Sequence, residues 1–366
     1  MRHSSTQWNR EGPTGYGAKP VAFDVKPPAI DELLADAGWL AHRYNEREDS
    51  IHFRLTSRDD QRRAAFLTDE YLGTDAAQIA VARREIEPSL IPEAPIHFIF
   101  HSAFCCSTLL ARAFDVDGLA MGLKEPTILN DLHGWRRRGA KPAEVGAVLD
   151  LSLALLARPF AKGEAVVVKP SCLVNLFAPA MLAMRPASRA ILLRAPLRVF
   201  VGSVARKGMW GRLWVRDWLA KLAPEGLIQL GFEPDDYLRL TDLQVAAVCW
   251  LSQQALFDNM ASRFGKERVA GLESETLLAR PEEALAATAR QFGLNLGNTE
   301  LKALASGPAF RSHSKSGGQF GRSERDAERS EGEAPHQDEI DKVSVWAEAV
   351  AATAGLSLDL PAPLLA

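Results

Sequence analysis

One stretch, residues 96–114, most limits what this chain can fold into. It reads IHFIFHSAFCCSTLLARAF, which is a short apolar run rich in Ile and Phe, then a polar loop, then an apolar segment with helical spacing. The apolar run is typical of a buried strand, and the segment after the Ser-Thr pair is typical of the start of a helix. The sequence therefore predicts a strand, a tight loop and a helix in direct succession.

The loop of this unit, residues 102–108, is a candidate anion site. The first N–H groups of a helix have no partner inside the helix and carry partial positive charge, so a phosphate or sulfate in the loop meets backbone donors. Ser107 and Thr108 add hydroxyl groups. The loop lacks the Gly and Lys of the GxxxxGK[ST] motif, so it is not a standard nucleoside-triphosphatase loop, and an ordinary strand-to-helix turn stays open as the alternative.

Two further apolar runs end on a basic residue and precede a predicted helix. Residues 165–169 end at Lys169, and residues 190–194 end at Arg194. Strand, helix and strand with connections of this length require parallel strands, whose carboxyl ends share one edge of a sheet. The pattern predicts an α/β fold with a mainly parallel sheet.

The charged strand ends are candidate ligand residues, because ligands of open α/β sheets collect at the carboxyl ends of the strands. The loop, Lys169 and Arg194 together describe a cationic pocket that suits a ligand with several anionic groups. Lys124 and Glu125 end another short apolar run, just before Pro126. Adjacent residues on an extended chain point to opposite faces, so these two reach one pocket only if the backbone is irregular there.

The composition is that of a globular protein. Of the 366 residues, 47% are hydrophobic and 24% are charged, and the net charge of -3 gives no support to a nucleic-acid partner. No apolar run reaches the roughly 18 residues of a membrane span, and the N-terminus lacks the apolar core of a secretory signal, so we expect a cytoplasmic location. The four cysteines show neither a zinc spacing nor a disulfide framework.

Patterning along the chain predicts four parts. We expect a flexible leader over residues 1–20, an N-terminal α/β appendage over residues 21–90, a main α/β domain over residues 91–356 and a tail over residues 357–366. In the appendage, the spacing predicts a helix over residues 30–44, a strand over residues 51–56 and a helix capped by Ser57 that continues through Tyr71.

A polar tract interrupts the main domain over residues 306–337, where Ser, Gly, Arg, Glu and Lys replace the apolar residues. A tract of this length in a compact chain is typical of a functional lid or of a disordered loop. Its basic residues, Lys315 among them, are candidates to close over an anion.

The order of the elements resembles the sulfotransferase superfamily, in particular a divergent bacterial-type member, whose enzymes take a sulfuryl group from 3′-phosphoadenosine-5′-phosphosulfate. The clearest similarity covers residues 166–207, VVVKPSCLVNLFAPAMLAMRPASRAILLRAPLRVFVGSVARK. It is similar to the family's lysine-containing strand end, connecting helix and arginine-to-serine segment. Residues 250–294 are similar to the family's C-terminal half. The resemblance implies a three-layer α/β/α fold of the P-loop nucleoside-triphosphatase type.

The resemblance also implies roles for individual residues. The 3′-phosphate is assigned to Arg194 and Ser203. Glu125, within LKEPTILND, is similar to the catalytic base of the heparan-type sulfotransferases, and Lys169, with Lys124 as a further candidate, is implied to stabilise charge on the transferring group. The 5′-phosphosulfate is assigned to the loop residues Ser102, Ala103, Phe104, Cys105, Cys106, Ser107 and Thr108.

The chain departs from the family pattern at two places. Phe104 stands where the family loop usually has a basic residue, while Cys106 and Ser107 replace its glycine and first threonine. The family's serine normally falls eight residues after the arginine, and Gly202 holds that position here, so Ser203 is one residue late. The loss of the loop cation weakens the site unless Lys169 or Lys124 supplies the charge.

The expected function is transfer of a sulfuryl group to a hydroxyl or amine of a small molecule or glycan, with adenosine 3′,5′-bisphosphate as the second product. A sulfuryl group carries less charge than a phosphoryl group, so we expect no metal. A diverged P-loop small-molecule kinase and a non-catalytic nucleotide-binding module stay open as alternatives.

Overall fold

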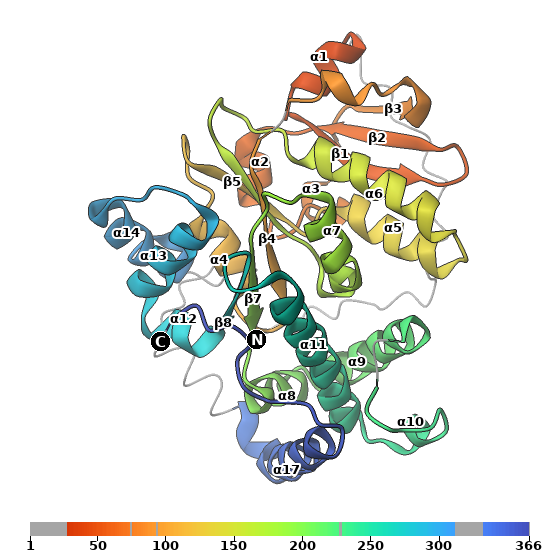
Figure 1. Ribbon diagram of the computed structural model, residues 1–366, viewed down its shortest axis with the longest axis vertical. Helices are drawn as coiled ribbons and strands as arrows, with labels where there is room; N and C mark the ends of the chain where they lie inside the picture. The colour runs from red at the N-terminus through yellow and green to blue at the C-terminus, as the bar shows by residue number, and fades with distance from the viewer. Residues whose placement is uncertain (1–27, 74, 93, 227–228, 312–331, 366) are drawn as a thin grey trace, which may run out of the picture.

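The computed structural model describes residues 28–73, 75–92, 94–226, 229–311 and 332–365. In these residues the chain forms two sheets surrounded by helices (Figure 1). The smaller sheet has the strand order β1-β2-β3 and is antiparallel. The larger sheet has the order β5-β6-β4-β7-β8, and all its pairings are parallel. The predicted α/β fold with a mainly parallel sheet is confirmed.

The smaller sheet consists of β1 (Trp39–Asn45), β2 (Ser50–Leu55) and β3 (Gln78–Ala82). The larger sheet consists of β4 (Ile96–His101), β5 (Ala120–Lys124), β6 (Ala165–Lys169), β7 (Ala190–Arg194) and β8 (Val269–Glu273). The α-helices are α1 (Ile30–Ala35), α2 (Arg58–Arg63), α3 (Asp69–Leu72), α4 (Ser107–Ala113), α5 (Thr127–Arg137), α6 (Pro142–Leu156), α7 (Ala178–Met184), α8 (Leu197–Arg206), α9 (Gly208–Leu222), α10 (Asp236–Arg239), α11 (Asp242–Phe264), α12 (Ser274–Ala279), α13 (Pro281–Phe292), α14 (Asn298–Ala305), α15 (Pro308–Arg311) and α17 (Gln337–Thr353). The 3₁₀ turns are η1 (Arg83–Glu85), η2 (Pro88–Leu90), η3 (Cys172–Phe177), η4 (Ala223–Glu225) and η5 (Ala334–His336).

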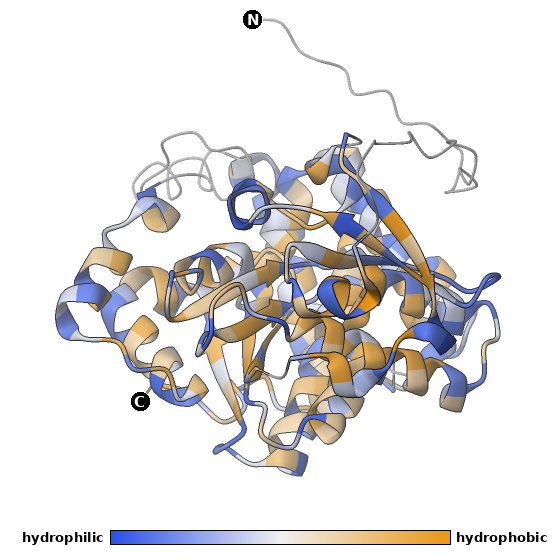
Figure 2. Cartoon of the chain, turned by 90° about the horizontal axis from the view of Figure 1, so that it is seen from above, coloured by the Kyte–Doolittle hydropathy of each residue, from blue (hydrophilic) through white to orange (hydrophobic). Residues whose placement is uncertain are grey.

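The larger sheet is buried on both faces, which explains why its strands read as continuous apolar runs. Ile99, Val167 and Leu193 face a core built with α4, α8, α9, α11, α13 and α17. Their neighbours along the strands face a second core built with α5, α6, α7 and the smaller sheet. Figure 2 shows these central strands largely in the hydrophobic colour, with hydrophilic stretches on the outer helices. The three-layer arrangement is therefore confirmed.

The helix predicted over residues 30–44 is wrong. Helix α1 ends at Ala35, and residues Trp39–Asn45 instead form β1, which pairs with β2 in an antiparallel hairpin. Strand pairing and burial of the aromatic side chains Trp39 and Tyr44 outweigh the helical spacing of the apolar residues. The strand predicted over residues 51–56 is confirmed as β2, with bounds shifted by one residue.

The helix predicted from Ser57 through Tyr71 is correct at its start and at its end, which lies in α3, but wrong in between. Ser57 caps α2 together with Asp60, but α2 ends at Arg63. Beyond α2, the backbone of Leu67 forms hydrogen bonds with residues at the end of β5 and the start of α5. Its amide donates to the carbonyl of Lys124 at 2.7 Å, and its carbonyl accepts from Thr127 Oγ1 at 2.9 Å. These bonds hold residues 64–68 against the end of β5 and prevent a continuous helix.

The C-terminal segment packs along the outer strand of the larger sheet. The amide of Gly271 in β8 donates to the carbonyl of Ala362 at 2.8 Å, and the amide of Leu364 donates to the carbonyl of Gly271 at 2.8 Å.

The predicted leader, residues 1–20, lies outside the described residues. Among the helices that the structure describes, none has both the length and the apolar character needed to cross a bilayer.

Candidate functional site

The candidate site lies along the carboxyl edge of the larger sheet. Its five parallel strands end there side by side, as the sequence predicted. In the order of the sheet, the polar residues at or just after the strand ends are Glu125, Lys169, His101, Arg194 and Glu273. The edge therefore carries an acid–base pair on each side of the loop that follows β4.

Glu125 and Lys169 form the first of these pairs. Lys169 Nζ binds Glu125 Oε1, and the amide of Glu125 donates to the carbonyl of Lys169 at 2.7 Å. The Lys169 side chain is 1% exposed and the Glu125 side chain 20% exposed, so a ligand reaches the carboxylate more easily than the ammonium. Glu125 has a φ of 52°, so the backbone is irregular directly after Lys124, although the two side chains do not reach one pocket.

Lys124 binds elsewhere. Its side chain is fully buried, and Nζ donates to the carbonyls of Gln61 at 2.7 Å and Arg62 at 3.0 Å, at the end of α2. Burial lowers the pKa of Lys124 to about 7. In this arrangement Nζ of Lys124 anchors α2 to β5, and Glu125 takes a different partner.

His101 links the loop to the Glu125–Lys169 pair. Its Nδ1 accepts from the amide of Ala103 at 3.1 Å, and its Nε2 lies 3.0 Å from the carbonyl of Pro170. A ring that accepts on one nitrogen and donates from the other is neutral. Nε2 also lies 4.0 Å from Glu125 Oε1. Sequence reasoning missed His101, although its place as the last residue of an apolar strand was a usable signal.

The loop between β4 and α4 has an unusual backbone. Ala103, Phe104 and Cys106 have φ values of 66°, 49° and 62°, in the left-handed region that non-glycine residues rarely adopt. The first hydrogen bond of α4 runs from the amide of Leu110 to the carbonyl of Cys106. The amides of residues 107–109 therefore have no acceptor within the helix. Such a conformation fits a loop shaped around an anion.

Serine and threonine hydroxyls surround this loop. Ser102 is buried, and its Oγ accepts from the amide of Ala195 at 3.1 Å, which ties the loop to the end of β7. Ser107 and Thr108 form the buried first turn of α4. The start of α4 thus carries two hydroxyl groups next to the first amides of the helix.

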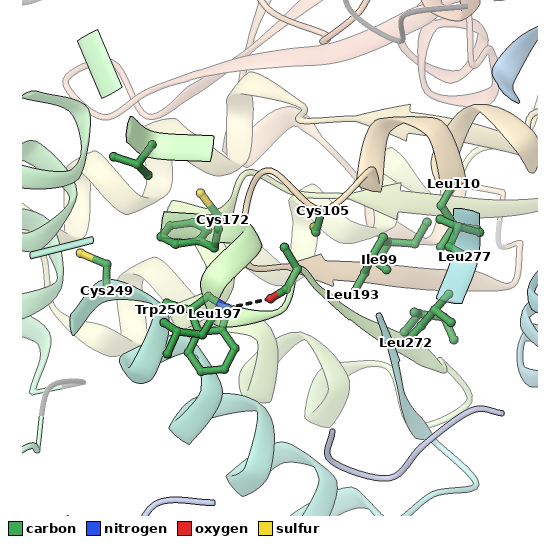
Figure 3. Packing of buried hydrophobic residues seen from close by; sticks show 14 of the residues in the cluster. Ile99, Cys105, Leu110, Cys172, Leu193, Leu197, Cys249, Trp250, Leu272 and Leu277 are labelled. Carbon is green, nitrogen blue, oxygen red and sulfur yellow. Dashed lines mark hydrogen bonds between the residues drawn. The ribbon is translucent and has the colours of Figure 1, made fainter. Parts of the chain in front are cut away.

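Phe104 and Cys105 make the floor of the loop apolar. The Phe104 ring lies 5.3 Å from the Trp214 ring and 5.8 Å from the Phe200 ring, so it packs on α8 and α9. Burial raises the pKa of the Cys105 thiol and raises that of Cys172 to about 12. Figure 3 shows both cysteines within the apolar cluster. Neutral thiols in such surroundings are not nucleophiles.

Arg194 forms the second acid–base pair. Its Nε and Nη2 donate to Glu273 Oε1 at 3.1 and 2.8 Å. Its Nη1 donates to Gln254 Oε1 at 2.5 Å and to the carbonyl of Asp359 at 3.0 Å. The guanidinium also lies 5.4 Å from the ring of Trp250, whose Nε1 donates to the carbonyl of Ala195, the dashed line in Figure 3. Most of the donors of Arg194 are therefore occupied within the chain.

Ser203 in α8 makes no contact with Arg194 among the described hydrogen bonds. Ser203 is buried, donates from Oγ to the carbonyl of Val199 at 2.8 Å and accepts from Arg206 at 3.2 Å. A Cβ atom placed on Gly202 would lie 2.5 Å from Glu333 Oε1. A carboxylate thus fills the space where the family pattern has its serine side chain. Lys315 lies outside the described residues.

Residues 64–68, which connect α2 to α3, also reach the site. Lys169 Nζ lies 4.9 Å from the centre of the Phe66 ring, a cation–π contact. The Phe66 ring in turn meets the Tyr71 ring edge-on at 5.3 Å. No sequence signal pointed to Phe66, because its contact depends on how residues 64–68 cross the end of β5.

No cluster of three or more His, Cys, Asp or Glu side chains suited to a metal ion occurs in the described part of the chain.

Comparisons with known proteins identify structural similarity only. Neither a protein-family model nor a curated protein matches the sequence. The sulfotransferase domain from the curacin biosynthetic pathway is 16% identical, covers 73% of this chain and 99% of its own, and has a TM-score of 0.41. The sulfotransferase domain of the Synechococcus PCC 7002 olefin synthase is 14% identical over 60% of this chain and 80% of its own, with a TM-score of 0.38. A sulfotransferase from Alicyclobacillus acidocaldarius is 15% identical over 55% and 82%, with a TM-score of 0.34.

Proposed function

We propose that this chain transfers a sulfuryl group from 3′-phosphoadenosine-5′-phosphosulfate to a hydroxyl or amine of a small acceptor. The observation that carries the proposal is the Glu125–Lys169 ion pair at the ends of adjacent strands, beside the left-handed loop that begins α4. The resemblance of residues 166–207 to the sulfotransferase segment supports this choice of donor.

The described residues fit one end of this donor well. The amides at the start of α4, with the Ser107 and Thr108 hydroxyls, offer donors to a phosphosulfate. Lys169 offers the cation that Phe104 does not. The 3′-phosphate end fits only if the phosphate replaces Glu273 as the partner of Arg194. The Glu273 side chain is 27% exposed, so water can hydrate its carboxylate after this exchange.

When bound, the donor supplies an electrophilic sulfuryl group on a nucleotide leaving group. Glu125 is the residue that takes the proton of the acceptor hydroxyl, because its carboxylate is the exposed member of the pair. Protonation removes the negative charge that holds Lys169. The Lys169 ammonium is then available to stabilise charge on the transferring group. The ion pair thus couples removal of the proton to electrostatic stabilisation.

Titration calorimetry of the full chain with adenosine 3′,5′-bisphosphate tests the proposal. We expect binding in the wild type and a loss of at least about tenfold in affinity for Lys169→Met, since a charged hydrogen bond contributes roughly 1.5–3 kcal/mol. Arg84→Met is the matched control, because the Arg84 side chain is 83% exposed. An absence of bisphosphate binding, or tighter binding of ADP with Mg²⁺, would overturn the proposal and favour a kinase.

A further inference from the structure

A pocket of about 470 Å³ lies between the end of β2, helix α2 and the α3 region. It belongs to the part of the chain for which the sequence offered no functional interpretation. Its polar lining includes Arg54, Asp60, Arg63, Tyr71 and Asp75. A pocket of this size with few convergent polar groups suits a small molecule.

Arg54 is the deepest charged group of the pocket. The residue is 2% exposed, and the hydrogen bond of its side chain to a described residue runs from Nη2 to the carbonyl of Leu72 at 2.7 Å. Its Nε is buried without a hydrogen-bond partner among the described residues. A buried guanidinium with unused donors is costly unless an anion or acceptor meets it.

The other charges of the pocket lie nearer to solvent. Arg63 is 72% exposed and Asp60 is 50% exposed, and the two form an ion pair at 2.5 Å. Asp60 also binds the hydroxyl and the amide of Ser57, so its charge serves the cap of α2. Burial lowers the pKa of Arg54, while Asp69 and Asp75 oppose this shift from nearby. The floor of the pocket is therefore cationic and its rim is mixed.

The pocket adjoins the proposed catalytic pair. Tyr71 lines the pocket and contacts Phe66, whose ring lies on Lys169. Ala64 and Ala65, which also line it, directly precede Phe66 along the segment that crosses the end of β5. Burial raises the pKa of Tyr71, and the negative charges of Glu70 and Glu125 add to this shift. Two ring contacts, Tyr71 on Phe66 and Phe66 on Lys169, thus join the pocket wall to the Glu125–Lys169 pair.

We propose that this pocket binds the acceptor, and that the acceptor is a small hydroxylated compound whose carboxylate is held by Arg54. The forked donors of a guanidinium match the two oxygens of a carboxylate. The acceptor role rests on the proposed function, whereas binding of the carboxylate does not. In the reaction the acceptor oxygen forms a bond to sulfur, the bond from sulfur to the nucleotide phosphate oxygen breaks, and the hydroxyl proton passes to Glu125.

Binding of matched acids and amides tests the inference. The probes are 4-hydroxybenzoate with 4-hydroxybenzamide and 6-hydroxyhexanoate with 6-hydroxyhexanamide, titrated into the full chain by calorimetry. We expect at least one acid to bind about tenfold or more tightly than its amide. Arg54→Met is expected to remove this preference. Arg84→Met, which changes an exposed arginine in η1, is expected to retain it.

A second variant covers the risk that Arg54→Met does not fold. Ala76 lines the pocket and is partly exposed, so Ala76→Phe fills the pocket without removing a core residue, and it is expected to weaken binding of the acid. Absence of an acid preference in the wild type overturns the inference. So does a preference that survives both Arg54→Met and Ala76→Phe.

Parallel titrations with adenosine 3′,5′-bisphosphate separate the two proposals. If the bisphosphate binds but no acid is preferred, the inference about the pocket fails and the proposed function stands. If the acid preference depends on Arg54 while the bisphosphate does not bind, the proposed function fails and the carboxylate site stands. We expect Arg54→Met to leave bisphosphate affinity unchanged, since Arg54 belongs to the smaller sheet.

Discussion

Glu125 and Lys169 bind each other at the carboxyl ends of neighbouring strands, although 44 positions separate them in the sequence. The pair holds a buried ammonium and a partly exposed carboxylate at the place where the loop of β4 begins. Neither residue has this role alone, because the carboxylate keeps the buried ammonium compensated and the ammonium orients the carboxylate.

The first prediction separates proton removal from binding. Glu125→Gln keeps the shape of the side chain and removes the base, so we expect release of adenosine 3′,5′-bisphosphate from the donor, in the presence of an acceptor, to slow by about 10²–10⁴-fold. Bisphosphate affinity is expected to be kept or raised, by up to about tenfold, because the neutral side chain in Glu125→Gln no longer competes as a charged partner for Lys169. Glu282→Gln, on the exposed start of α13, is the control. Equal rates for the two variants would exclude Glu125 as the base.

A second prediction concerns Lys124 and pH. Burial lowers its pKa in the folded chain from 10.5 to about 7. Between about pH 7 and pH 10.5 the unfolded chain therefore holds more protons than the folded chain, so the contribution of Lys124 to the free energy of unfolding rises with pH. The slope approaches about 1.4 kcal/mol per pH unit within this window.

Urea denaturation of the wild type and Lys124→Met at pH 7, 8, 9 and 10 measures this contribution. The wild type is expected to gain stability relative to Lys124→Met as the pH rises, and the difference is expected to be constant below pH 7. Lys162→Met, at an exposed position, should track the wild type. Parallel curves for wild type and Lys124→Met would contradict the buried placement of this ammonium.

The third prediction concerns the pair on the other side of the loop. Glu273→Gln keeps a side chain of the same size but removes the charge that competes for Arg194. If the 3′-phosphate takes the place of Glu273, calorimetry with the bisphosphate should show affinity raised by up to about tenfold for Glu273→Gln and lowered for Arg194→Met. Unchanged affinity in both variants would place the 3′-phosphate elsewhere.

Much of the larger sheet could be predicted, because a strand buried on both faces is apolar at every position and therefore visible in the sequence. The strands ending at His101, Lys169 and Arg194 all carry this signal. The hairpin β1–β2 was harder, since the residues of β1 also fit helical spacing and only pairing with β2 decides between the two. The division of the chain into leader, appendage, main domain and tail stays a prediction.

The charge balance of the site could not be predicted from the sequence. The basic strand ends indicated a cationic pocket, but Glu125 lies against Lys169 and Glu273 against Arg194. Both contacts follow from the strand order β5-β6-β4-β7-β8, which places β5 beside β6 and β7 beside β8. No periodicity along the chain encodes that order. The contact of Phe66 with Lys169 was hidden for the same reason.

The last prediction concerns Gly202 and Glu333. A Cβ on Gly202 would lie 2.5 Å from Glu333 Oε1, too close for the present position of the carboxylate. Gly202→Ala is therefore expected to lower the free energy of unfolding by about 1–3 kcal/mol, the usual cost of overpacking. Gly146 in α6 offers the matched control, because among the described residues its Cβ would meet Met184 Cε alone, at 3.8 Å.

Gly146→Ala has room and gains helix propensity, so urea denaturation should show its free energy of unfolding raised by up to about 1 kcal/mol. Combining Gly202→Ala with Glu333→Ala removes the clash, so the double variant should be more stable than the two single changes predict by addition. Strict additivity would mean that Glu333 does not fill the space at Gly202. If the coupling is found, the same double variant should also bind adenosine 3′,5′-bisphosphate more tightly, because a carboxylate has left the helix face that follows Arg194.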